Sequence, residues 1–155
     1  MSLHHSPRST LARAARGQRG VGLIEVLVSV LVVTLGLLGA AALQASALRN
    51  NQSSYERTQS SILSQAIFDA MRANLVDVAA NAYNTSGYVC TPPVAAGLAN
   101  SDKARWITTL QQQIHSGACG EIVCATSACT VRVRWDDSRA TGGSSAQVIE
   151  LRAQL

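Results

Sequence analysis

Residues 16–30 read RGQRGVGLIEVLVSV, in which basic residues give way to an apolar run that holds a single carboxylate, Glu25. The 23 residues from 26 to 48 carry no charged side chain. At about 1.5 Å per residue, a helix of this length can cross a hydrocarbon core of about 30 Å. A buried core helix is the alternative, but only about a hundred other residues would have to cover it on every side. The stretch therefore predicts a membrane-spanning segment.

Charge is distributed unevenly along the chain. The formal net charge is +4, with 13 basic and 9 acidic residues, and four arginines precede Gly20: Arg8, Arg13, Arg16 and Arg19. Arginines ahead of an apolar segment hold that flank in the cytoplasm, so we expect the C-terminal part to lie outside. That part is near neutral, which disfavours nucleic acid as a partner because a phosphate-binding surface shows clustered Lys and Arg.

A secretory signal peptide also combines a basic start, an apolar run and a cleavage site of small residues. Residues 40–42, AAA, could mimic such a site. The apolar run is too long for a signal peptide, however, and it continues as an apolar-patterned helix without a break. We therefore expect the segment to be retained.

Residues 19–28, RGVGLIEVLV, resemble the prepilin motif of type IV pilins and pseudopilins. In that family a short basic leader ends in glycine and is followed by Phe-Thr-Leu-Ile-Glu and an apolar helix. The resemblance implies that a prepilin peptidase cleaves between Gly20 and Val21 and that Val21 is then N-methylated. Val21 and Gly22 depart from the usual Phe and Thr.

The same resemblance implies a role in assembly for Glu25. A carboxylate at the centre of a membrane helix costs roughly 2.5–3.5 kcal/mol, and less near an end. In the family this residue is thought to meet the N-terminal amine of a neighbouring subunit, and such a pair offsets the desolvation. A second and compatible role is a favourable place near a helix N-terminus, for about 0.3–1 kcal/mol.

Three further segments are similar to PilV-type minor pilins of Gram-negative bacteria: LGLLGAAALQ at 35–44, NQSSY at 51–55 and AMRAN at 70–74. The resemblance implies a minor pilin that starts in the inner membrane and helps to prime a type IV pilus used for twitching motility or adhesion. Its partners would be other minor pilins, the major pilin and, as a further candidate, a tip adhesin. Two alternatives stay open: a minor pseudopilin of type II secretion, and a head that binds DNA or a surface.

Beyond residue 49 the apolar residues recur at steps of three and four, which predicts an amphipathic continuation of the same helix to about Asp77. Its apolar stripe comprises Tyr55, Ile62, Leu63, Ala66, Ile67, Ala70, Met71, Leu75 and Val78. Residues 79–100 form a loop with two central prolines. A short helix should then begin at Ser101 or Asp102, run through His115 and stop at Gly117, with Trp106 as a core anchor.

Alternation predicts strands at 121–124, 130–135 and 147–152. A small antiparallel sheet buries one face, and the stripe of the long helix is the available cover. We predict a pilin-like α+β fold: one long N-terminal helix packed on a sheet of about three strands, with one short extra helix. The expected organisation is a leader at 1–20, a membrane or filament-core half-helix at 21–48, an amphipathic half-helix at 49–78 and a periplasmic head at 79–155.

Four cysteines follow the apolar segment: Cys90, Cys119, Cys124 and Cys129. In an oxidising compartment they form disulfides, and four cysteines allow three full pairings. We favour Cys124 with Cys129 across a hairpin and Cys90 with Cys119. Zinc is the weaker alternative, because His115 is the only nearby histidine.

No pattern of residues predicts catalysis. His115 has no obvious base partner, there is no phosphate loop or nucleophile elbow, and Asp136 and Asp137 fit turn chemistry at a strand end. An enzyme is therefore not expected, and no cofactor is indicated.

Overall fold

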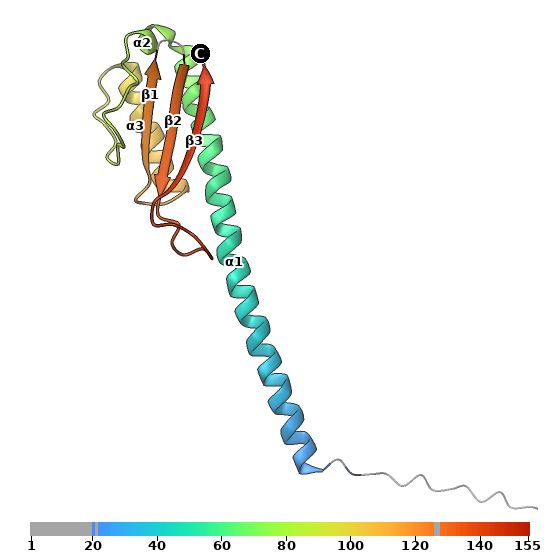
Figure 1. Ribbon diagram of the computed structural model, residues 1–155. Helices are drawn as coiled ribbons and strands as arrows, with labels where there is room; N and C mark the ends of the chain where they lie inside the picture. The colour runs from blue at the N-terminus through green and yellow to red at the C-terminus, as the bar shows by residue number, and fades with distance from the viewer. Residues whose placement is uncertain (1–19, 21, 126–127) are drawn as a thin grey trace, which may run out of the picture. The chain divides into compact units, whose positions relative to one another are not determined.

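The computed structural model describes residues 20, 22–125 and 128–155, and the chain divides into two compact units, of which the second is Ala41–Leu155. The elements follow in the order α1 (Leu23–Ala73), α2 (Leu75–Ala79), α3 (Gly97–Gln113), β1 (Cys119–Ala125), β2 (Ala128–Trp135) and β3 (Gln147–Gln154), as labelled in Figure 1. The predicted α+β class is confirmed. Helix α1 begins in the first unit and continues into the second.

The first unit contains the apolar start of α1. The backbone oxygen of Gly22 accepts hydrogen bonds from the amides of Glu25 (2.9 Å) and Val26 (3.3 Å), which closes the first turn. The most apolar 18-residue window of α1 has a mean hydropathy of 2.6, and none of it is buried. Among the described residues, α1 is the one helix whose length and composition suffice to cross a membrane.

In the second unit, β1, β2 and β3 form an antiparallel sheet in sequence order. Helix α3 and the C-terminal part of α1 lie on one face of it (Figure 1). Alternate residues of β2 are buried, so this strand supplies Val131, Val133 and Trp135 to the core, as its alternation predicts. Trp106 of α3 is buried in the same core, which confirms it as a core residue. The strands exceed the predicted spans by one or two residues at one or both ends.

The buried face of α1 differs from the predicted stripe. Leu63, Ile67 and Met71 are buried, but Tyr55 and Ile62 are half exposed. Phe68 and four polar residues are buried on this face as well. The polar residues are Ser53, Glu56, Ser60 and Ser64. The apolar pattern therefore gives the wrong face between residues 53 and 62, because polar contacts rather than apolar packing hold this part of α1.

The helix ends also differ from prediction. Helix α1 stops at Ala73 rather than near Asp77, because Asn74 leaves the helical conformation (φ −134°, ψ 58°) and donates its side-chain amide to Asp77 Oδ2 at 2.6 Å. Such local bonds compete with helix propagation. Helix α3 begins at Gly97, whose φ of +78° suits glycine, and not at Ser101, whose hydroxyl donates to the Gly97 oxygen inside the helix.

Two disulfides, Cys90–Cys119 and Cys124–Cys129, join the cysteines in the pairing favoured from the sequence. Cys124 and Cys129 are also register partners of β1 and β2, and residues 126–127 of the predicted turn between them lie outside the described residues. The Cys90–Cys119 bridge holds the loop after α2 against β1. In this loop, Val89 makes two backbone hydrogen bonds to Gly120, which protects the outer edge of β1.

A buried tyrosine joins the loop to two helices. Tyr83 is fully buried, and its hydroxyl donates to Asp102 Oδ2 of α3 at 2.7 Å. Asn74, between α1 and α2, donates to the same hydroxyl at 3.4 Å. Burial first, and then the hydrogen bond to Asp102, raise the pKa of Tyr83 from 10.0 to about 12.

This raised pKa predicts a loss of stability in alkali. Unfolded tyrosine ionises near pH 10 whereas folded Tyr83 ionises near pH 12, so its contribution to stability is complete below pH 10 and lost as the pH rises through 12. We expect the urea midpoint of the full chain in detergent, followed by tryptophan fluorescence, to fall from pH 9 to pH 11. The fall should be smaller in Tyr83→Phe. An equal fall in both proteins would mean that Tyr83 does not carry this dependence.

Candidate functional site

The candidate processing residues lie at the start of the described chain. Gly20 is exposed and non-helical, Val21 lies outside the described residues, and Gly22 is exposed just before α1. Gly20 and Gly22, on either side of Val21, are thus accessible to solvent.

Glu25 lies in the first turn of α1. It is exposed, and its carboxylate makes no hydrogen bond or ion pair with any other described residue. The helix dipole favours a negative charge in this turn. The carboxylate is therefore available to a positively charged group outside this chain.

A second group of polar residues holds the loop between β2 and β3 on α1. The carboxylate of Asp137 is 3% exposed and accepts hydrogen bonds from Ser53 Oγ (2.6 Å) and Arg57 Nη2 (3.4 Å). Further along the loop, the Thr141 amide donates to Asn50 Oδ1 at 3.1 Å. The loop thus docks on the first turns of α1 that follow the apolar run.

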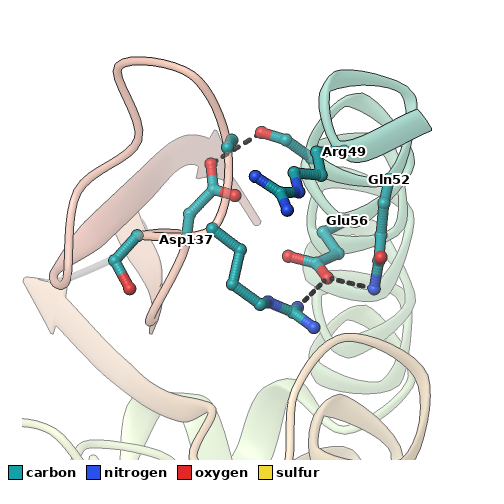
Figure 2. Close-up of a pocket in the computed structure, with 8 residues that line it drawn as sticks. Arg49, Gln52, Glu56 and Asp137 are labelled. Carbon is teal, nitrogen blue, oxygen red and sulfur yellow. Dashed lines mark hydrogen bonds and ion pairs between the residues drawn. The ribbon is translucent and has the colours of Figure 1, made fainter. Parts of the chain in front are cut away.

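Glu56 supplies the second ion pair of this contact, shown in Figure 2. It is 2% exposed, and its Oε1 accepts from Arg139 Nη2 of the loop (2.9 Å) and from Gln52 Nε2 (3.2 Å). The loop folds back closely on Asp137 at Gly143, where an added Cβ would collide with the Asp137 backbone oxygen. This position therefore requires glycine. We call Ser53, Glu56, Arg57, Asp137 and Arg139 the loop clamp.

No sequence pattern predicted the loop clamp. Turn chemistry was expected of both Asp136 and Asp137, and it holds for Asp136: its Oδ1 accepts from the Ser138 amide at 2.9 Å, and this bond lowers the pKa of Asp136. Asp137 instead points to α1. The available signal was Ser53 and Glu56 in helical spacing with Ser60 and Leu63, a polar extension of the core face.

The loop clamp predicts a clear response to Asp137→Ala. The change leaves the Ser53 hydroxyl without its acceptor and leaves Arg57 with only Gln147 Oε1, at a cost of about 1.5 kcal/mol to loop docking. Trypsin should then cleave after Arg139 roughly tenfold faster, because local opening exposes the loop. Asp136→Ala is the matched control, since it removes an exposed carboxylate and its bond to the Ser138 amide but no contact with α1. Equal cleavage rates in the two variants would show that Asp137 does not hold the loop.

Basic residues on the outer face of the sheet are paired. Arg132 of β2 forms ion pairs with Glu121 of β1 and Glu150 of β3, and these bonds raise the pKa of Arg132 and lower that of Glu150. The guanidinium of Arg134 lies 4.3 Å from the centre of the Tyr88 ring. Arg132 and Arg134 therefore have partners within the chain, and this face is not a simple cationic patch.

Comparison with known proteins adds a finding at the N-terminus. Residues 15–41 match the family model for the prokaryotic N-terminal methylation motif. No curated protein and no solved structure matches the chain significantly. The motif is typical of type IV pilins and pseudopilins, which are non-enzymatic structural proteins processed by prepilin peptidase. Its apolar helix suggests anchoring in the inner membrane before assembly into a pilus-like fibre. The chain is thus a type IV pilin-like protein with a prepilin cleavage and methylation motif.

Proposed function

We propose that this protein is a minor pilin of a type IV pilus, of the PilV type, which joins other minor pilins in a complex that primes pilus assembly. The observation that carries the proposal is the methylation motif at residues 15–41, placed at the start of a helix that leads into a small disulfide-bonded head. The similarity of residues 35–44, 51–55 and 70–74 to PilV-type minor pilins supports the finer assignment.

In this proposal the chain enters the inner membrane through residues 21–48, with the leader, 1–20, in the cytoplasm. Prepilin peptidase cleaves after Gly20 and methylates Val21. The amphipathic half-helix, 49–78, and the head, 79–155, lie in the periplasm, where an oxidising environment maintains disulfides. The two disulfides, Cys90–Cys119 and Cys124–Cys129, are consistent with that compartment.

Glu25 gives the proposal its assembly chemistry. Its carboxylate has no partner among the described residues, whereas a filament of apolar helices brings the methylated amine of Val21 of a neighbouring subunit to the same depth. An ion pair in that environment is favourable only when both charges are present and aligned. Glu25 would therefore select subunits that are in register.

Deletion of the gene distinguishes a role in the pilus from a role in type II secretion. We expect a deletion strain to lose surface pili and twitching motility, to keep normal levels of secreted enzymes, and to recover pili when the intact gene is returned. Normal pili with a loss of secreted enzymes would instead assign the protein to the secretion system as a minor pseudopilin. Normal pili and normal secretion would contradict both assignments.

A further inference from the structure

A pocket of about 380 Å³ lies between α1 and the loop that follows β2. Its charged lining consists of Arg49 and Glu56 from α1 and Asp137 and Arg139 from the loop (Figure 2). Two guanidinium groups and two carboxylates give the lining no net charge. A pocket with both signs of charge fits a zwitterionic ligand better than a simple anion or cation.

One carboxylate oxygen in this pocket lacks a donor. Glu56 Oε1 accepts two hydrogen bonds, but Glu56 Oε2 is buried and has no hydrogen-bond partner among the described residues. Figure 2 shows the Glu56 carboxylate pointing toward the loop. A buried acceptor without a donor is costly, and more so when it is charged. The Arg139 guanidinium bonds to Oε1 of the same carboxylate, and its side chain is 56% exposed. A donor to Oε2 therefore has to enter beside this ion pair.

Arg49 supplies the complementary group. Its exposed side chain lines the same pocket, and it makes no hydrogen bond or ion pair with any other described residue. Arg49 precedes Glu56 by seven positions, two helical turns, so both lie on the same side of α1. A ligand that accepts from Arg49 and donates to Glu56 Oε2 would satisfy both groups.

The position of the pocket identifies the source of such a ligand. Arg49 directly follows Leu48, the last residue of the uncharged run. The loop extends further toward the N-terminus of α1, since Thr141 Oγ1 lies 3.3 Å from Ser46 Oγ, within the uncharged run. If residues 21–48 span the membrane, as the proposed function requires, the pocket lies at the level of the lipid headgroups on the outer surface of the inner membrane.

We propose that this pocket binds the headgroup of a phospholipid that carries a primary ammonium, of the phosphatidylethanolamine class. Arg49 donates to the phosphate, and the ammonium donates to Glu56 Oε2, with Asp137 as a second negative charge nearby. Phosphatidylcholine has no N–H to donate, and phosphatidylglycerol has no cation to place beside Glu56. The bound headgroup would hold the loop at the membrane surface until the subunit leaves the membrane for the filament.

The test uses the full chain in nanodiscs made with equal parts of the three phospholipids. After gentle transfer to detergent, native mass spectrometry counts the lipids retained by each protein molecule. We expect phosphatidylethanolamine to be retained roughly tenfold more than the other two lipids, because all three offer a phosphate to Arg49 but only its ammonium can donate a charge-assisted hydrogen bond to Glu56. Glu56→Gln should abolish this preference, whereas Arg49→Ala should lower the retention of all three lipids. Arg105→Ala is the charge-matched control, because Arg105 lies on α3, outside the pocket.

Equal retention of the three lipids by the wild type would overturn the proposal and leave water as the ligand of Glu56. Stronger retention of phosphatidylglycerol would also overturn it, in favour of simple anion binding by Arg49. Tryptophan fluorescence identifies a Glu56→Gln protein that has lost its fold. In that case Arg49→Ala decides, because lipid retention equal to that of the wild type would overturn the proposal. A wild-type chain that fails to enter nanodiscs would contradict the membrane anchor itself, whereas entry without lipid preference contradicts only this inference.

Discussion

Chains that carry Glu25→Gln are expected to be cleaved and methylated normally but to enter filaments at least tenfold less than the wild type. In the proposed filament, the substitution would leave the N-terminal amine of a neighbouring subunit buried without its counter-ion, and breaking a buried pair in this way costs about 3–5 kcal/mol. The measurement is the ratio of protein in sheared filaments to protein in the membrane fraction, determined by immunoblot in cells that lack the wild-type copy.

Ser29→Ala provides the matched control for Glu25→Gln. Ser29 lies one turn further along the same helix, and among the described residues its hydroxyl bonds only to the Val26 backbone oxygen. We expect this variant to assemble as the wild type does. Filament levels of Glu25→Gln equal to those of Ser29→Ala would remove the assembly role of Glu25 and leave only its favourable place at the helix N-terminus.

Gly120→Ala is expected to destabilise the head by about 3 kcal/mol. Gly120 lies in β1 directly against α3, and an added Cβ would collide with the six-membered ring of Trp106 and lie 2.9 Å from Ile107 Cδ1. Both neighbours are buried and cannot move without disturbing the core, so the added methyl overpacks it. Urea unfolding in detergent measures the loss, since the only two tryptophans, Trp106 and Trp135, are both buried in the head.

Gly39→Ala is the control for Gly120→Ala. A Cβ at Gly39 would meet no atom within 4 Å, and α1 is helical there, so alanine should leave head unfolding unchanged. A Gly120→Ala protein that unfolds at the same urea concentration as Gly39→Ala would show that the α3 contact with β1 is looser than the structure describes.

The sequence predicts best where one physical effect acts alone. Alternation in β2 identified its buried residues, because a half-buried strand must place successive side chains on opposite faces. The long helix was predicted from an apolar run that only a membrane or a bundle of helices can cover. The methylation motif at residues 15–41 supports the pilin resemblance drawn from residues 19–28.

Prediction failed where polar groups replace apolar packing. Tyr55 and Ile62 fit an apolar stripe by spacing, yet Ser53 and Glu56 face the loop, because a carboxylate and a hydroxyl can be buried when partners from the β2 to β3 connection meet them. Those partners lie more than 80 residues away, and spacing within a helix cannot reveal them. Asn74 ended α1 through a local side-chain bond that periodicity does not register.

The central claim is that this chain is processed as a pilin. Mass spectrometry of the N-terminus, in cells with and without prepilin peptidase, tests it most directly. We predict a mature chain that begins at Val21 and carries an N-methyl group, and its absence in cells that lack the peptidase. An intact N-terminus in both strains, or cleavage near Ala42, would identify a plain membrane anchor or a secretory signal peptide and would contradict the filament role.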